Sequence, residues 1–117
     1  MNRFSKTLIA STLLVGFSAT VAAQDCVLPT APIIPDGNVA SKDELISAQG
    51  AYKEYELNID GYRGCLEEKD KAIVVDAEGA AEQKAELLAL DGASVDALTK
   101  VAEEFNVAVR AFKAKSN

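Results

Sequence analysis

The chain has 117 residues, with 12 Lys and Arg against 18 Asp and Glu, no histidine and no tryptophan. Its formal net charge of −6 predicts a surface that repels nucleic acid and anionic lipid, because proteins bind both through clustered lysine and arginine. Without histidine the chain has no imidazole base, no Ser-His or Cys-His pair and no ordinary zinc site. The length allows a single domain.

The first 23 residues have the three parts of a secretory signal peptide. Arg3 and Lys6 give a basic start, an apolar run follows, and small residues end at Ala23. The apolar run has about half of the ~20 residues that a spanning helix needs, so we expect cleavage, not anchoring. Cleavage between Ala23 and Gln24 leaves 10 basic and 18 acidic residues, a net charge of −8 and no membrane span. The sequence therefore predicts a periplasmic or secreted protein.

Residues 24–40 form an arm in which proline recurs every third residue, at Pro29, Pro32 and Pro35. Three residues is the period of a polyproline II helix, which has no internal hydrogen bonds and needs a surface to lie against. The alternative is a disordered leader, which is the common fate of a proline-rich terminus.

The two cysteines, Cys26 and Cys65, both belong to the mature chain, and in an oxidising compartment two thiols usually pair. Cys65 lies ~36 Å along a helix that begins at Ser41, at 1.5 Å per residue. The arm from Cys26 spans up to ~46 Å as polyproline II, so it can run back along the helix and reach Cys65. We therefore predict an intrachain Cys26–Cys65 disulfide; a disulfide-linked dimer is the alternative.

A first helix is predicted from Ser41, where Ser41 and Glu44 have the spacing of a capping box. A heptad pattern follows, which places one stripe of residues on one face and predicts a partner helix lying nearly parallel to it. The core positions are Leu45, Tyr52, Ile59, Leu66 and Ile73, with Ala48, Tyr55, Tyr62, Lys69 and Asp76. We interpret the three tyrosines as core residues, not as a ligand-stacking surface.

The pattern is interrupted at Glu78-Gly79 and then resumes. Its positions are Ala81, Leu88, Val95, Ala102 and Val109, with Lys84, Asp91, Leu98, Phe105 and Phe112. Folding the chain back at Gly79 sets Tyr52 against Phe105. The same register places Lys69 near Asp91 and Asp76 near Lys84. The sequence thus predicts an all-α protein, with a coiled-coil-like antiparallel two-helix hairpin over residues 41–117. The alternative is a three-helix bundle, in which Asp91-Gly92 forms a turn and Ser94 caps a third helix.

No constellation of residues points to catalysis. There is no glycine-rich phosphate loop, and the adjacent carboxylates Glu67 and Glu68 diverge by about 100° on a helix. Asp91-Gly92 lacks the alternating ligands and closing glutamate of a calcium loop. We therefore expect a protein that is not an enzyme and that uses no metal or other cofactor.

Apolar residues outside the predicted helix–helix seam indicate a second use of the surface, because small cores are marginal without staples or association. The predicted interaction surface, for a protein partner or a second copy, consists of Leu57, Leu87, Leu90, Val101 and Val107. The function expected is protein–protein or cell-envelope interaction. The alternatives are a small-ligand carrier and a self-associating structural protein.

The chain resembles a group of small exported helical-hairpin proteins of Gram-negative bacteria whose function is not established. The resemblance rests on Cys26 with the Pro-Asp-Gly stretch ending at Gly37, and on the Tyr-x-x-Cys-Leu element from Tyr62 to Leu66. It also rests on the Ala-x-x-Phe-Asn and Val-Arg-Ala-Phe-Lys elements at 102–106 and 109–113. It covers most of the mature chain, implies a periplasmic helical protein and carries no catalytic residues over.

Overall fold

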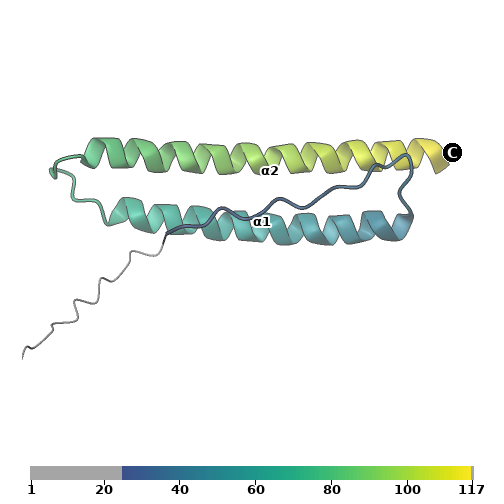
Figure 1. Ribbon diagram of the computed structural model, residues 1–117, viewed down its shortest axis with the longest axis horizontal. Helices are drawn as coiled ribbons and strands as arrows, with labels where there is room; N and C mark the ends of the chain where they lie inside the picture. The colour runs from purple at the N-terminus through teal and green to yellow at the C-terminus, as the bar shows by residue number, and fades with distance from the viewer. Residues whose placement is uncertain (1–24, 117) are drawn as a thin grey trace, which may run out of the picture.

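The computed structural model describes residues 25–116, which form two long antiparallel helices and an extended arm (Figure 1). Helix α1 spans Lys42–Lys71 and helix α2 spans Ala80–Ser116. The predicted all-α hairpin is therefore confirmed. The predicted cleavage site between Ala23 and Gln24 lies outside the described residues. The alternative with a break at Asp91-Gly92 is wrong, because α2 runs through that dipeptide without interruption.

Helix α1 begins at the predicted capping box. The Ser41 hydroxyl accepts a hydrogen bond from the Glu44 amide at 3.1 Å, and the Glu44 carboxylate accepts one from the Ser41 amide at 2.6 Å. The helix ends at Lys71, earlier than the predicted stripe requires, so Ile73 and Asp76 lie in the loop 72–79. Gly79 closes that loop with a φ of 79°, a conformation that favours glycine.

The helices meet along the predicted face of α1. Tyr52 stacks on Phe105 with ring centroids 6.1 Å apart, as the predicted register requires. Ile59, which is fully buried, packs in one cluster with Leu98. One predicted row of α2 is wrong by one residue. The buried residues of α2 are not Ala81, Leu88, Val95, Ala102 and Val109 but their predecessors at Ala80, Ser94, Val101 and Ala108, with Leu87 half-buried.

The arm explains this rotation of α2. It crosses one face of the hairpin from the end where α2 finishes to the far half of α1 (Figure 1). Ile34 packs against two buried clusters that contain residues of both helices. Gly37 lies so close to α2 that an added Cβ would be 1.8 Å from the Ala108 carbonyl oxygen. The arm thus acts as a third packing element, and the side of α2 turned toward it becomes the buried side.

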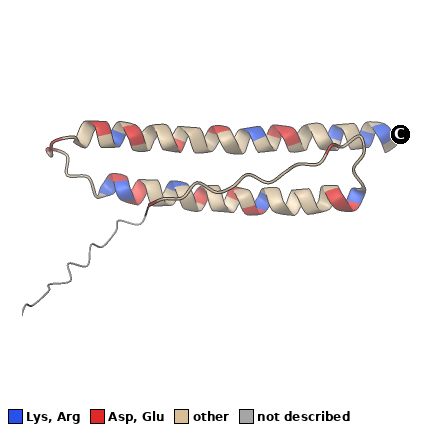
Figure 2. Cartoon of the chain, in the orientation of Figure 1, with Lys and Arg blue, Asp and Glu red and all other residues tan. Residues whose placement is uncertain are grey.

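The arm follows the period that its prolines predict. Cys26, Pro29, Pro32 and Pro35 are half-buried, whereas Val27 and Ile33 are 79% and 94% exposed. From Cys26 to Pro32 one residue in three therefore faces the helices, as in a polyproline II segment, and at the end of this run Ile34 faces them as well. The arm ends in an intrachain Cys26–Cys65 disulfide whose Cα atoms are 5.8 Å apart. Figure 2 shows that the arm is almost free of charge, in contrast to both helices.

Candidate interaction surface

The five residues of the predicted interaction surface do not form one patch. Leu57 and Val107 are 71% and 56% exposed, but they belong to different helices and line no common groove. Val101 is a correction: it is only 3% exposed and packs with Tyr55 and Ile59, because the arm turns this side of α2 inward. It cannot contact a partner while the hairpin is folded.

The other two residues, Leu87 and Leu90, lie together in an open groove of about 670 Å³ at the loop end of the hairpin. We call this the apex groove. Its apolar lining includes Leu66 on α1, Ile73 in the loop, and Leu87 and Leu90 on α2. Leu66 is buried, Leu87 and Ile73 are half-buried, and Leu90 is 40% exposed. The groove therefore has a hydrophobic floor that is rooted in the core and open to solvent.

The apex groove begins where the arm ends. Cys26 and Asp25 line it, and among the described residues of the arm they alone do so. The Lys69 ammonium lies 3.6 Å from the Asp25 carboxylate, whose side chain is 96% exposed. Glu78 and Glu86 also border the groove. The arm and the apex groove thus occupy successive stretches of one channel between α1 and α2.

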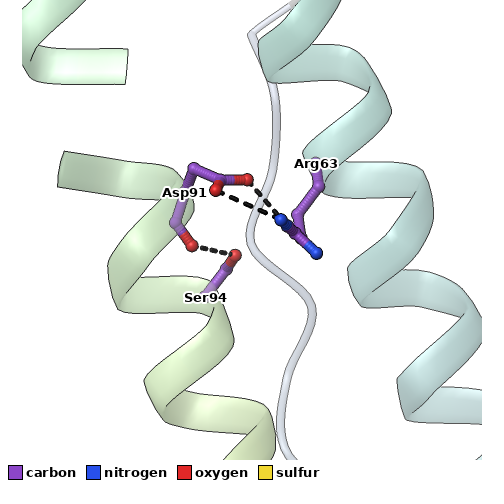
Figure 3. A network of polar contacts seen from close by, with 3 residues as sticks. All are labelled: Arg63, Asp91 and Ser94. Atoms are coloured by element: carbon purple, nitrogen blue, oxygen red, sulfur yellow. Dashed lines mark hydrogen bonds and ion pairs between the residues drawn. The ribbon is translucent and has the colours of Figure 1, made fainter. Parts of the chain in front are cut away.

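A polar cluster lies near Leu66 and Leu87 but opens into a different pocket (Figure 3). The Arg63 guanidinium donates to both Asp91 carboxylate oxygens, at 2.7 and 3.3 Å. This contact lowers the pKa of Asp91 through hydrogen bonding first and charge attraction second, and the same contact raises the pKa of Arg63. The Ser94 hydroxyl donates to the Asp91 carbonyl oxygen at 2.6 Å, so this fully buried side chain is satisfied within α2.

The sequence predicts other partners for these charges, placing Lys69 near Asp91 and Asp76 near Lys84. The structure pairs Lys84 with Asp70 at 3.1 Å and Asp91 with Arg63. The prediction was wrong because α1 ends before Asp76 and because α2 is rotated. No group of side chains in residues 25–116 has the arrangement that a metal ion needs.

Neither α1 nor α2, the helices of the described chain, combines the length and apolar character required to cross a membrane. A comparison with models of known families, with curated proteins and with solved structures finds no match for the chain. The candidate site therefore rests on its own geometry. Sequence reasoning included Leu87 and Leu90 in it but assigned Leu66 and Ile73 to the seam. Gly79, which sets the loop length, is the feature of the sequence from which Ile73 could have been predicted to lie in the loop and not in the helix.

Proposed function

We propose that this protein is a non-catalytic binding module of the periplasm or the extracellular space. Its apex groove takes an extended, proline-rich apolar segment of a partner polypeptide. The observation that carries the proposal is the continuity of the apex groove with the channel that already holds the arm. The channel accepts the extended, proline-rich arm up to Cys26, and its next stretch has an apolar floor and no occupant from residues 27–116.

The arm indicates what such an occupant looks like. Between residues 26 and 35 no hydrogen bond joins the arm to either helix, so in this described segment side-chain packing and the disulfide hold it. Ile34, which packs against two buried clusters, and half-buried prolines at every third position supply that packing. A polyproline II segment loses little conformational entropy on binding, because it is already extended in solution. A partner segment of the same type needs only apolar pockets, which Leu66, Leu87 and Leu90 supply.

Shape and charge favour this function over its rivals. A small-ligand carrier encloses most of its ligand, whereas the apex groove is open along its length and suits a chain that enters and leaves it. A net charge of −8 after the predicted cleavage disfavours anionic lipid and nucleic acid as partners. The predicted signal peptide of residues 1–23 and the resemblance to exported helical-hairpin proteins support a location outside the cytoplasm, and the disulfide is compatible with it.

The test uses the oxidised mature protein and a fluorescent peptide copied from residues 25–36, with serine in place of Cys26. We expect its fluorescence anisotropy to rise on titration with the wild-type protein. Leu90→Glu should weaken binding about tenfold or more, because it places a charge in the apolar groove. Leu57→Glu is the matched control, since Leu57 is also exposed but lies outside the groove; it should bind like the wild type.

Two further titrations separate the alternatives. A peptide with glycine at the three proline positions should bind more weakly, because it loses the pre-formed polyproline II conformation. Phosphatidylglycerol vesicles should not bind to the protein or displace the peptide. The proposal fails if the peptide does not bind, if Leu90→Glu binds it as well as the wild type does, or if the vesicles compete with it.

A further inference from the structure

A second surface, uncharged and mostly apolar, runs along α2 on the side turned away from the arm. We call it the back stripe. Its residues recur with alternating spacings of four and three, as in a coiled-coil seam, and none of them is charged. They are Ala81, Ala85, Leu88, Gly92, Val95, Thr99, Ala102, Asn106 and Val109. In a chain of which 26% of the residues are charged, an uncharged stripe of four heptads is unusual enough to need an explanation.

The back stripe is exposed but joins an existing interface. Leu88 is 74% exposed and Val95 is 38% exposed. Ala102 and Val109 are half-buried, and they lie beside the row of α2 that faces α1. An additional helix on this stripe would therefore extend the packed core of the hairpin, because it would contact residues that adjoin the existing interface between α1 and α2.

Two details suit the stripe to a helix–helix contact. The Thr99 hydroxyl donates to the Val95 carbonyl oxygen at 2.9 Å, so this polar group is already satisfied within α2. Gly92 has no neighbouring atom within 4 Å of the position that a Cβ would occupy. It leaves an open depression between Leu88 and Val95, one turn away on either side.

We propose that a second copy of this chain covers the back stripe, so that two hairpins join antiparallel through their α2 helices. A symmetric dimer uses the same surface twice, so the stripe must fit itself when it is reversed. An axis between Gly92 and Val95 meets this condition: Val95 of each copy covers Gly92 of the other. The same axis sets Leu88 against the smaller Thr99. A parallel pair would set Leu88 on Leu88 and Gly92 on Gly92, which leaves a void.

The dimer leaves the apex groove free, because no residue of the back stripe lines that groove, whereas Leu90 lines it and not the pocket beside Leu88. The inference thus goes beyond the proposed function and does not depend on it. It also predicts a salt effect. The outer edge of the back stripe carries Glu82, Asp96, Glu103 and Arg110, so its net charge is negative and repels the same edge of the other copy. Added salt screens this repulsion, so the dimer should become tighter at higher ionic strength.

The first test is sedimentation equilibrium of the oxidised mature protein over a range of protein concentrations. We expect a monomer–dimer equilibrium. Leu88→Glu should raise the dissociation constant about 100-fold, since it buries a charge in the contact. Gly92→Leu fills the depression opposite Val95 and should raise it about tenfold. Leu57→Glu is the control on α1 and should leave the constant within about twofold. Circular dichroism melting verifies that each variant is folded.

The second test fixes the direction of the pair. A spin label attached at position 82 in place of the glutamate should give a distance of about 35 Å between the two copies, because residue 105 of one lies level with residue 82 of the other. A parallel pair would bring the labels within about 20 Å. The proposal is overturned by a monomer at every concentration, by a dimer that Leu88→Glu does not weaken, or by the shorter label distance.

Discussion

The two ends of the hairpin are built from the same helices but differ in what covers them. At the base, where α1 begins and α2 ends, Ala40, Leu45 and Ala108 are buried beneath Ile34 of the arm. The Lys115 ammonium donates to the Ala40 carbonyl oxygen at 2.7 Å and joins the end of α2 to the start of α1. At the apex only Asp25 and Cys26 of the described arm border the helices, and the loop residues Val74 and Val75 are 69% and 77% exposed.

This difference shows why a two-helix hairpin needs a third segment. Two helices bury only the narrow stripe along which they touch, and the flanking apolar residues stay at the surface. The arm covers those residues at the base and produces a core there. Beyond the Cys26–Cys65 bond no residue of the described range 25–116 lies over the flanking residues, which line the apex groove. The disulfide therefore marks the boundary between a part of the molecule that the arm packs against and a part whose apolar groove is open to solvent.

The largest effect on stability is expected from removing the Cys26–Cys65 disulfide. Replacing Cys26 and Cys65 together by serine should lower the free energy of unfolding by about 4 kcal/mol, because the bond closes a loop with a sequence separation of 39 residues. Urea denaturation followed by circular dichroism measures the loss. Amide hydrogen exchange should show that protection falls in α1 around Cys65 but persists in the turn after Pro35. A loss below about 1 kcal/mol would mean that packing alone holds the arm.

The close contact of the arm with α2 gives the next prediction, at the base. Gly37→Ala should destabilise the protein by about 3 kcal/mol, because its Cβ would overlap the Ala108 backbone, which cannot move without displacing α2. Gly50→Ala is the matched control: nothing lies within 4 Å of that position, which is inside α1. It should stabilise the protein by about 0.5–1 kcal/mol. Equal effects of the two changes in thermal denaturation would show that the arm does not press on α2.

One substitution made at both places compares the packing directly. Ile59 is fully buried in the part of the channel that the arm covers, whereas Ile73 is half-buried in the apex groove. Ile59→Val should cost about 1 kcal/mol, and Ile73→Val less than about half of that, because a methyl group lost from a solvent-exposed groove leaves no cavity. Urea denaturation of the two variants measures the difference. A larger cost at Ile73 would mean that the apex is packed as tightly as the core.

Much of the base could be predicted from the sequence. The Ser41 capping box, the facing of Tyr52 and Phe105 and the reach of the arm follow from local spacing and element lengths, which tertiary packing does not alter. The rotation of α2 could not be predicted in the same way. Rows beginning at Ala80 and at Ala81 flank the central row symmetrically, and the second row is the more apolar, with valine at position 95 where the first has Ser94. Which of the two rows is buried depends on the side of the hairpin that the arm covers.

The apex was harder to predict for a related reason. The heptad pattern continues past Lys71 to Ile73 and Asp76, but the helix does not, because the chain must reverse before Gly79. Heptad spacing reports which residues could share a face and contains no information on where a helix stops. Leu87 was predicted to lie outside the seam because one predicted row of α2 was wrong by one residue, and the same error misplaced Val101. The sequence therefore identified residues of the groove without indicating that they meet.

The smallest effect concerns the polar cluster between Arg63 and Asp91. Because Arg63 lowers the pKa of Asp91 below its ordinary value of 3.8, the ion pair stabilises the fold above that pH, and its contribution is lost as the pH falls through the lowered pKa. Arg63→Gln should return the pKa of Asp91 toward 3.8, which carbon-detected NMR titration measures. Stability near neutral pH should change little, since an exposed pair contributes little and salt screens it.

Lys100→Gln is the control for this titration. Its ammonium lies 4.0 Å from Glu104 and its side chain is 77% exposed, far along α2 from Asp91, so the Asp91 titration should not change. Ser41 lowers the pKa of Glu44 at the start of α1 through two hydrogen bonds, and that shift should persist in both variants. If Arg63→Gln left the Asp91 titration unchanged, the pair would not be formed in solution. The apex would then be held by Leu66, Leu87 and the loop alone, and the contrast with the base would be larger.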